Sequence, residues 1–186
     1  VRELVDLTIS FYRRNYIEGL FLSSGVCGSP GNTMRKMLQV VMELRNRHNY
    51  NGYIHMKAIP GAEPELIARA GLYADRLSIN IEIPTEKNLK MLAPEKSFNM
   101  IFTPMTRIRN SILQNKAERK KFKRVPQYTP AGQSTQLIIG ASPEADLEIL
   151  KFSTLLYCRQ NLRRVFYSGF LPAGMKDKRL PALAHP

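Results

Sequence analysis

The spacing of apolar residues changes repeatedly along the chain, and each change predicts a new element. Residues 3–15 carry apolar side chains at helical spacing, which predicts an amphipathic helix. Residues 19–25 form a short apolar run that ends in small polar residues, a pattern typical of a buried parallel strand that opens into a loop. By the same reasoning, further helices are predicted over 32–47, 64–73, 86–92, 97–124 and 144–161, and further strands over 52–59, 76–83, 135–139 and 164–169.

Strands that alternate with helices predict right-handed crossovers and a parallel sheet, so we expect an α/β fold. Residues 1–172 are predicted to form one unit without a second domain, and residues 173–186 are interpreted as a linker or tail toward a further C-terminal region. Met34 and Met37 lie on the apolar face of the second helix, and we expect them in the core. In a barrel or an open parallel sheet, ligands bind at the carboxyl ends of the strands.

Small and polar residues gather at these predicted strand ends. Asn80 and Glu82 lie two positions apart on one strand, so both side chains should point the same way, where they could bind hydroxyl groups or an amine. Small residues at the first and fourth strand ends would let a ligand approach the backbone N–H groups. Each residue also has a plain structural interpretation, as an internal hydrogen-bonding group or as a turn. The candidate ligand contacts are Ser23, Ser24, Gly25, Lys57, Asn80, Glu82, Gly140, Ala141, Glu144 and Ser168.

Composition and charge narrow the class of protein. The chain has 186 residues, of which 44% are hydrophobic, as expected for a globular protein with one core. Its formal net charge of +13 favours a polyanionic partner. Within residues 116–124, Glu118 is the single acid among six cations, which predicts a nucleic-acid-binding stretch, with a solvated helix end as the alternative. The six cations are Lys116, Arg119, Lys120, Lys121, Lys123 and Arg124.

Membrane and metal sites are not predicted from these residues. No apolar run approaches the roughly 18 residues that a membrane span needs, and a cytoplasmic protein without a membrane partner is expected. Cys27 and Cys158 are too far apart for a CxxC pair, and we interpret them as buried thiols. His48, His55 and His185 show no spacing typical of metal ligands.

Long stretches of the sequence resemble a radical SAM family described as DNA modification or repair proteins. The resemblance covers nearly the whole chain and rests on long strings of matching residues. The matching segments are Arg13–Gly25, Gly52–Lys57, Ile59–Ala62, Ala70–Ser78, Gln136–Asp146 and Arg164–Pro172.

This resemblance implies a partial (β/α) barrel of the radical SAM type, incomplete at its N-terminus. It implies that a CxxxCxxC loop, which would ligate a [4Fe-4S] cluster, precedes Val1, so the chain by itself is expected to be inactive. Ser23–Gly25 would occupy the position of a Gly-Gly-Glu motif that binds the methionine end of S-adenosyl-L-methionine (SAM), although no acid is present there. Asn80 and Glu82 match the strand that contacts the ribose, and Gly140–Glu144 match the adenine-binding turn.

The implied reaction is the reductive cleavage of SAM to a 5′-deoxyadenosyl radical, which removes hydrogen from a nucleic-acid substrate after an electron donor has reduced the cluster. No catalytic residue and no oligomeric state are predicted. Two alternatives stay open. One is a non-catalytic nucleic-acid-binding module that uses residues 116–124. The other is a barrel enzyme acting on a phosphorylated metabolite, with an anion loop at Gly28–Asn32 before a helix.

Overall fold

The computed structural model describes residues 1–172 and 177–181, so the predicted tail lies largely outside the described residues. The strands are β1 (Gly19–Leu22), β2 (Tyr53–Lys57), β3 (Arg76–Ser78), β4 (Gln133–Ile139) and β5 (Arg164–Gly169). The helices are α1 (Arg2–Arg13), α2 (Pro30–His48), α3 (Pro64–Ala70), α4 (Glu86–Leu92), α5 (Phe98–Lys121) and α6 (Asp146–Gln160).

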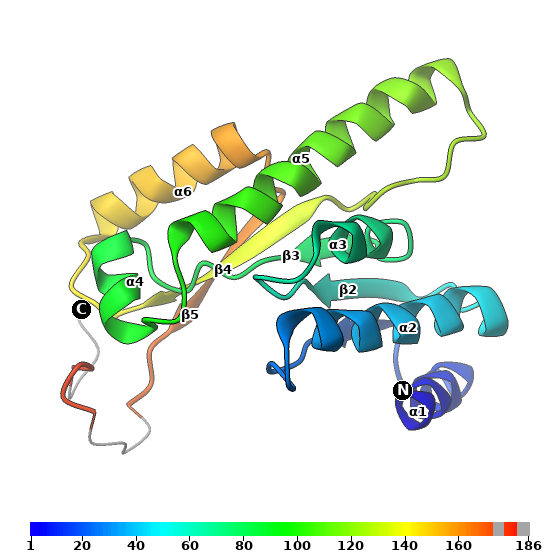
Figure 1. Cartoon of the computed structure of the whole chain (residues 1–186), viewed down its shortest axis with the longest axis horizontal. Coiled ribbons are helices and arrows are strands. Elements are labelled where there is room, and N and C mark those ends of the chain that lie inside the picture. Colours follow the sequence, from blue (N-terminus) through cyan, green and yellow to red (C-terminus); the bar gives the residue numbers. More distant parts are fainter. Residues whose placement is uncertain (173–176, 182–186) are drawn as a thin grey trace.

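The five strands form one sheet in the order β1-β2-β3-β4-β5, and every neighbouring pair is parallel. Each strand therefore lies beside the strand that precedes it in the chain, which is the topology of part of a (β/α) barrel. Helices α2, α3 and α5 run side by side over one face of this sheet (Figure 1). The prediction of an α/β fold with a partial barrel is confirmed.

The two faces of the sheet differ in chemistry. Neighbouring Leu22, Met56 and Leu77 are buried on the face that packs against the helices, together with Met34 and Met37 of α2, as predicted. The opposite face, which we call the polar face, is defined by the strand register. It carries Phe21, His55, Lys57, Arg76, Ser78, Ser134, Gln136, Ile138, Arg164, Phe166 and Ser168.

The third strand is shorter than the sequence predicts. A regular strand over 76–83 was expected, but β3 ends at Ser78. Ile79 N–H donates to the carbonyl of Ser134 at 3.3 Å, and Glu82 N–H donates to the carbonyl of Gln136 at 3.0 Å. Three residue steps on this side thus oppose two steps on β4, so one extra residue is accommodated in the manner of a β-bulge. Glu82 takes the left-handed conformation, with φ at 68°.

A threonine side chain replaces the missing ladder bonds at this bulge. The hydroxyl of Thr135 accepts the N–H of Ile81 at 3.1 Å and donates to the carbonyl of Ile79 at 2.8 Å. All three residues are almost fully buried, so the hydroxyl satisfies two backbone groups that water cannot reach. The bulge is therefore a fixed feature that sets where Asn80 and Glu82 lie.

An ion pair fastens the opposite edge of the sheet, where the strands begin. Arg45 of α2 contacts Asp75, which precedes β3, with 2.7 Å between Nη2 and Oδ2. The guanidinium also donates to the carbonyls of Gly52 at 2.9 Å and Tyr73 at 3.1 Å. The same Asp75 oxygen accepts the N–H of Ile54 at 2.7 Å. One charged network thus joins α2 to the starts of β2 and β3.

Candidate functional site

A carboxylate between two ammonium groups marks the carboxyl end of the sheet. Lys57 is the last residue of β2, and its Nζ lies 3.7 Å from Oε1 of Glu82. Lys96, which the sequence reasoning missed, brings its Nζ to 3.9 Å from the same oxygen. The side chain of Glu82 is 18% exposed. Both separations exceed hydrogen-bond distance, so the carboxylate is held electrostatically and its lone pairs are not used by these lysines.

Asn80 reaches the same face through its amide. Its Nδ2 lies 3.4 Å from Oε1 of Gln136, a polar-face residue of β4 that was not predicted to take part in a site. Asn80 and Glu82 therefore both contact polar-face residues. The bulge, however, produces this arrangement, and the regular alternation of a strand does not.

The loop after β1 leaves the sheet beside Lys57, since Leu22 pairs with Met56. Ser23, Ser24 and Gly25 are exposed, and the hydroxyl of Ser24 donates to the carbonyl of Gly25 at 2.7 Å. A Cβ at Gly25 would meet no atom within 4 Å, so packing does not require glycine at this position.

The ends of β4 and β5 supply the remaining predicted contacts. Gly140 directly follows β4 with φ at 85°, a conformation that favours glycine, and Ala141 is buried behind it. Ser168 is half-buried and pairs with Ile138, which places it on the polar face of β5. The parallel order thus brings these predicted residues to one edge of the sheet.

Glu144 is held by local hydrogen bonds. Its carboxylate accepts the hydroxyl of Thr85 at 2.6 Å, the amide of Asn88 at 2.8 Å and the hydroxyl of Ser142 at 2.5 Å. Burial raises the pKa of Glu144, but these three donors outweigh it and lower the pKa below its usual value. Glu144 therefore ties the β4–α6 turn to the start of α4, and its match to an adenine-binding turn stays a prediction.

Three buried polar atoms of the polar face lack hydrogen-bond partners among the described residues: His55 Nε2, Arg76 Nη1 and Ser134 Oγ. His55 and Arg76 are direct neighbours across β2 and β3. Burial, and then the charge of Arg76, lowers the pKa of His55 to about 4, so this imidazole is neutral at pH 7. The sequence could not reveal this group, because only the strand register brings it together.

The six basic residues of 116–124 lie at the end of α5 and in the turn that follows. The C-terminal part of α5 projects away from the sheet (Figure 1). Among residues 1–172 and 177–181, none of the six pairs with a carboxylate. Glu118 instead accepts the side-chain amide of Gln114 at 2.8 Å. The local field is therefore positive.

The suggested anion loop at Gly28–Asn32 has a structural explanation. The hydroxyl of Ser29 accepts the N–H of Asn32 at 3.1 Å and caps α2. The carboxylate of Glu63 already lies against Gly31, where an added Cβ would collide with it. A phosphate would have to displace this carboxylate, so the alternative of a phosphorylated metabolite loses its supporting feature.

Cys27 and Cys158 are both exposed, so the prediction of two buried thiols was wrong. Cys27 lies in the loop before α2, and Cys158 lies on an exposed side of α6. In the part of the chain that the structure describes, no group of three or more His, Cys, Asp or Glu side chains could hold a metal ion. None of the described helices combines the length and apolar character that a membrane crossing requires.

No protein-family model matches the chain, and no curated protein matches its sequence. Among solved structures, the chain is similar to a domain of pyruvate-formate lyase-activating enzyme from Bacteroides vulgatus ATCC 8482. The TM-score is 0.49 and the sequence identity is 10%, over 82% of this chain and all of that one. At this level of similarity, we transfer no role from that protein to this chain.

Proposed function

We propose that the chain is the SAM-binding part of a radical SAM iron-sulfur enzyme that acts on nucleic acid. The observation that carries this proposal is the meeting of Asn80, Glu82 and Lys57 at the carboxyl edge of a sequentially ordered parallel sheet. Ligands of parallel α/β folds bind at this edge. Asn80 and Glu82 are also the two residues that the sequence resemblance assigns to the ribose of SAM.

The chemistry of these side chains suits most of SAM. Neither lysine is within hydrogen-bond distance of Glu82, so its carboxylate retains lone pairs that could accept ribose hydroxyls. Lys57 and Lys96 could bind the methionine carboxylate, and Gly140 would let a flat adenine approach the backbone. Ser23–Gly25 contain no acid for the ammonium group, so only hydroxyl and carbonyl oxygens could accept from it there.

The described residues do not suit an iron-sulfur cluster, because no set of three ligands lies together. In this proposal, cysteines outside this chain would hold the [4Fe-4S] cluster. When bound, the cluster would supply the electron for the reductive cleavage of SAM. The residues of this chain would orient SAM and exclude water. A cytoplasmic location and an electron-donor protein as partner belong to the same proposal.

The basic stretch supports nucleic acid as the class of substrate. If about four cations contact phosphates of single-stranded DNA, the plot of log affinity against log salt should have a slope of about −3. Replacing Lys120, Lys121, Lys123 and Arg124 with glutamine should flatten this slope and weaken binding equally for all sequences, because phosphate contacts carry no base information. Fluorescence anisotropy over a salt series measures both effects.

A matched control removes the same charge elsewhere. Arg14, Lys36, Lys87 and Lys151 are exposed and make no ion pair among the described residues. Their replacement with glutamine should leave the slope near its original value. Equal slopes in the two quadruple variants would show that only net charge matters and would remove the support for a nucleic-acid substrate.

Calorimetric titration with SAM tests the ligand itself. Asn80→Ala and Glu82→Gln should each weaken SAM binding by about 1 to 3 kcal/mol, because a buried polar partner is lost. Glu86→Gln is the control, since Glu86 is an exposed acid that pairs with Lys90 at 3.4 Å within α4. Unchanged affinity in both site variants would contradict the proposed site. A chain that binds DNA but not SAM would favour the non-catalytic module, for which the uncompensated basic stretch is the supporting observation.

A further inference from the structure

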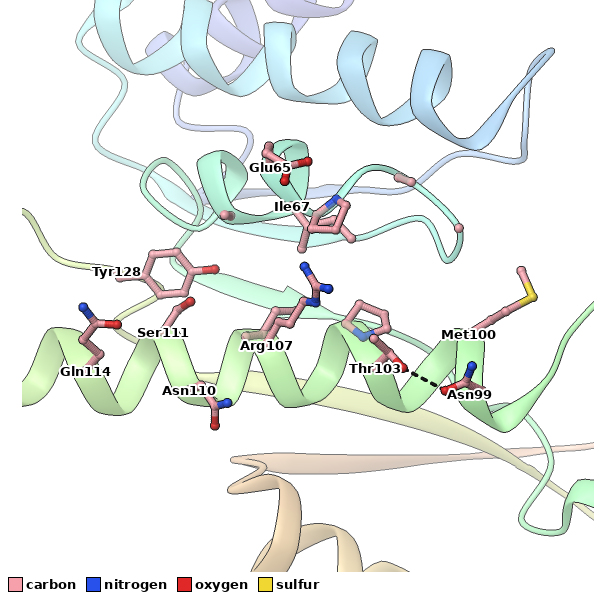
Figure 2. Close-up of a pocket in the computed structure, with 16 residues that line it drawn as sticks. Glu65, Ile67, Asn99, Met100, Thr103, Arg107, Asn110, Ser111, Gln114 and Tyr128 are labelled. Carbon is pink, nitrogen blue, oxygen red and sulfur yellow. Dashed lines mark hydrogen bonds between the residues drawn. The ribbon is translucent and has the colours of Figure 1, made fainter.

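A cleft of about 550 Å³ lies between α3 and α5, on the side of the sheet that the helices cover (Figure 2). Its volume is within the range of sites for small organic ligands, roughly 300 to 1,000 Å³. Nothing in the proposed reaction uses this cleft. Its lining joins an apolar wall to a group of hydrogen-bond donors, with the acid Glu65 on the α3 side.

The apolar wall comes from both helices. Ile67 and Ala68 contribute from α3, and Pro104 and Ile108 contribute from α5. The small side chain of Ala68 leaves open the space that a larger residue would fill. A flat apolar group can therefore lie between the two helices.

A guanidinium and two hydroxyl groups extend from the middle of the cleft toward the end that Tyr128 lines. Arg107 is exposed on α5 and extends from that helix toward α3 (Figure 2). It makes no ion pair or side-chain hydrogen bond within residues 1–172 and 177–181. The hydroxyl of Ser111 lies one turn further along the same face, and the phenol of Tyr128 faces the space between them and α3.

Tyr128 is fixed before any ligand arrives. Its ring lies directly against Gly71, where a Cβ would collide with it, and its N–H donates to Oδ1 of Asn115 at 3.0 Å. Burial raises the pKa of Tyr128 to about 12, although its hydrogen bond with Ser111 opposes this shift. The phenol therefore stays neutral and keeps a proton to donate.

The other end of the cleft offers an acceptor. Pro104 lies inside α5 and has no N–H, so the carbonyl of Met100 lacks its helical donor four residues further on. Met100 and Ser111 are separated by about 16 Å along the helix axis, at 1.5 Å per residue. The cleft can thus hold a ligand that has an anionic group at one end and a hydroxyl or amine at the other.

We propose that the cleft between α3 and α5 binds a small aromatic anion, a carboxylate or phosphate ester. Its charged group would contact Arg107 and the phenol of Tyr128, whose oxygen already accepts from Ser111, and its ring would lie against Ile67 and Pro104. Guanidinium and hydroxyl donors match both kinds of anion, and the apolar wall selects an aryl body over a free inorganic ion. The site is separate from the proposed SAM site at the strand ends.

Heteronuclear NMR titration of the chain with phenyl phosphate and with phenylacetate tests this proposal. We expect saturable shifts of amides around Ser111 and Tyr128, and at least tenfold weaker binding of both inorganic phosphate and benzyl alcohol. Arg107→Gln should weaken the binding of both aryl anions about tenfold, as expected for a lost charge-assisted hydrogen bond. Lys116→Gln, an equal change of charge on the same helix outside the cleft, should not.

Ala68→Phe should abolish binding by filling the cleft, and Ala68 is exposed, so the fold should tolerate the change. Comparison of the affinities for phenyl phosphate and phenylacetate shows whether the cleft prefers a phosphate or a carboxylate. Three results would overturn the proposal: no saturable binding of either aryl anion, equal binding of inorganic phosphate or benzyl alcohol, or equal weakening by Arg107→Gln and Lys116→Gln.

Discussion

Removal of one charge at the edge where the strands begin should destabilise the fold strongly. In Asp75→Asn, the guanidinium of Arg45 loses its anionic partner at 2.7 Å but stays among the carbonyls of Gly52 and Tyr73. The loss of one partner of a buried ion pair costs about 3 to 5 kcal/mol. The two side chains are 21% and 28% exposed, so the cost for this pair should lie at the lower end of that range. We therefore expect the free energy of unfolding to fall by about 3 kcal/mol.

Urea denaturation followed by circular dichroism measures this loss. With a slope of about 2 kcal/mol per molar urea, the midpoint should fall by about 1.5 M. Asp177→Asn is the control, because Asp177 lies even closer to Arg179, at 2.6 Å, yet that arginine is 49% exposed. Solvent screening should leave the midpoint of this variant unchanged. Similar losses in the two variants would refute the argument that burial and the surrounding carbonyls, and not distance, determine the energy.

Two further predictions concern the polar face and the bulge. The folded-state pKa of His55 is about 4 against about 6.5 when unfolded, so the unfolded chain binds more protons between these values. At about 1.4 kcal/mol per pKa unit, its contribution is on the order of 3 kcal/mol; it is complete above pH 6.5 and is lost as the pH falls toward 4. Denaturant titrations across this window should show a shallower pH dependence for His55→Gln, and an identical dependence would contradict the assignment. Thr135→Val should lower the free energy of unfolding by about 2 to 4 kcal/mol, measured by thermal or urea unfolding, because Ile79 and Ile81 each lose a buried hydrogen-bond partner. Thr154→Val is the control: it removes an exposed hydroxyl on α6 and should lower this free energy little. Equal losses in the two threonine variants would show that Thr135 does not support the bulge.

The order of elements could be predicted because apolar spacing and turn residues are local signals. The helix over 86–92 and the strand over 164–169 have the bounds that the sequence predicts. The prediction of a strand over 76–83 was too long, because Ile79, Ile81 and Ile83 are all buried and alternate as they would in a strand. The hydrogen bonds that replace the ladder there come from the side chain of Thr135, more than 50 residues away in sequence, and no local pattern reports it.

In the candidate site, too, some residues could be predicted from the sequence and others could not. Lys57 and Gly140 could be assigned to one edge from the sequence, because all parallel strands end at the same side. Gln136 and Lys96 could not. Gln136 joins the site through the register between β4 and its neighbours, and Lys96 reaches it from the segment between α4 and α5. Both depend on contacts between residues that lie far apart in the chain.

The Arg45–Asp75 pair and the Glu82 cluster, at opposite edges of the sheet, differ in how fully their charges are hydrogen-bonded, and this difference supports the location of the site. At the first edge, Arg45 and Asp75 meet at 2.7 Å, and several backbone groups complete their hydrogen bonds. At the other, Glu82 lies 3.7 and 3.9 Å from its two lysines and accepts no side-chain hydrogen bond among the described residues. A satisfied network stabilises the fold and leaves nothing for a ligand to bond. A partly buried carboxylate with free lone pairs gains most from a hydroxyl donor, because the ligand would restore bonds that burial has removed. Binding energy is therefore available at the carboxyl edge, where Asn80 and Glu82 lie.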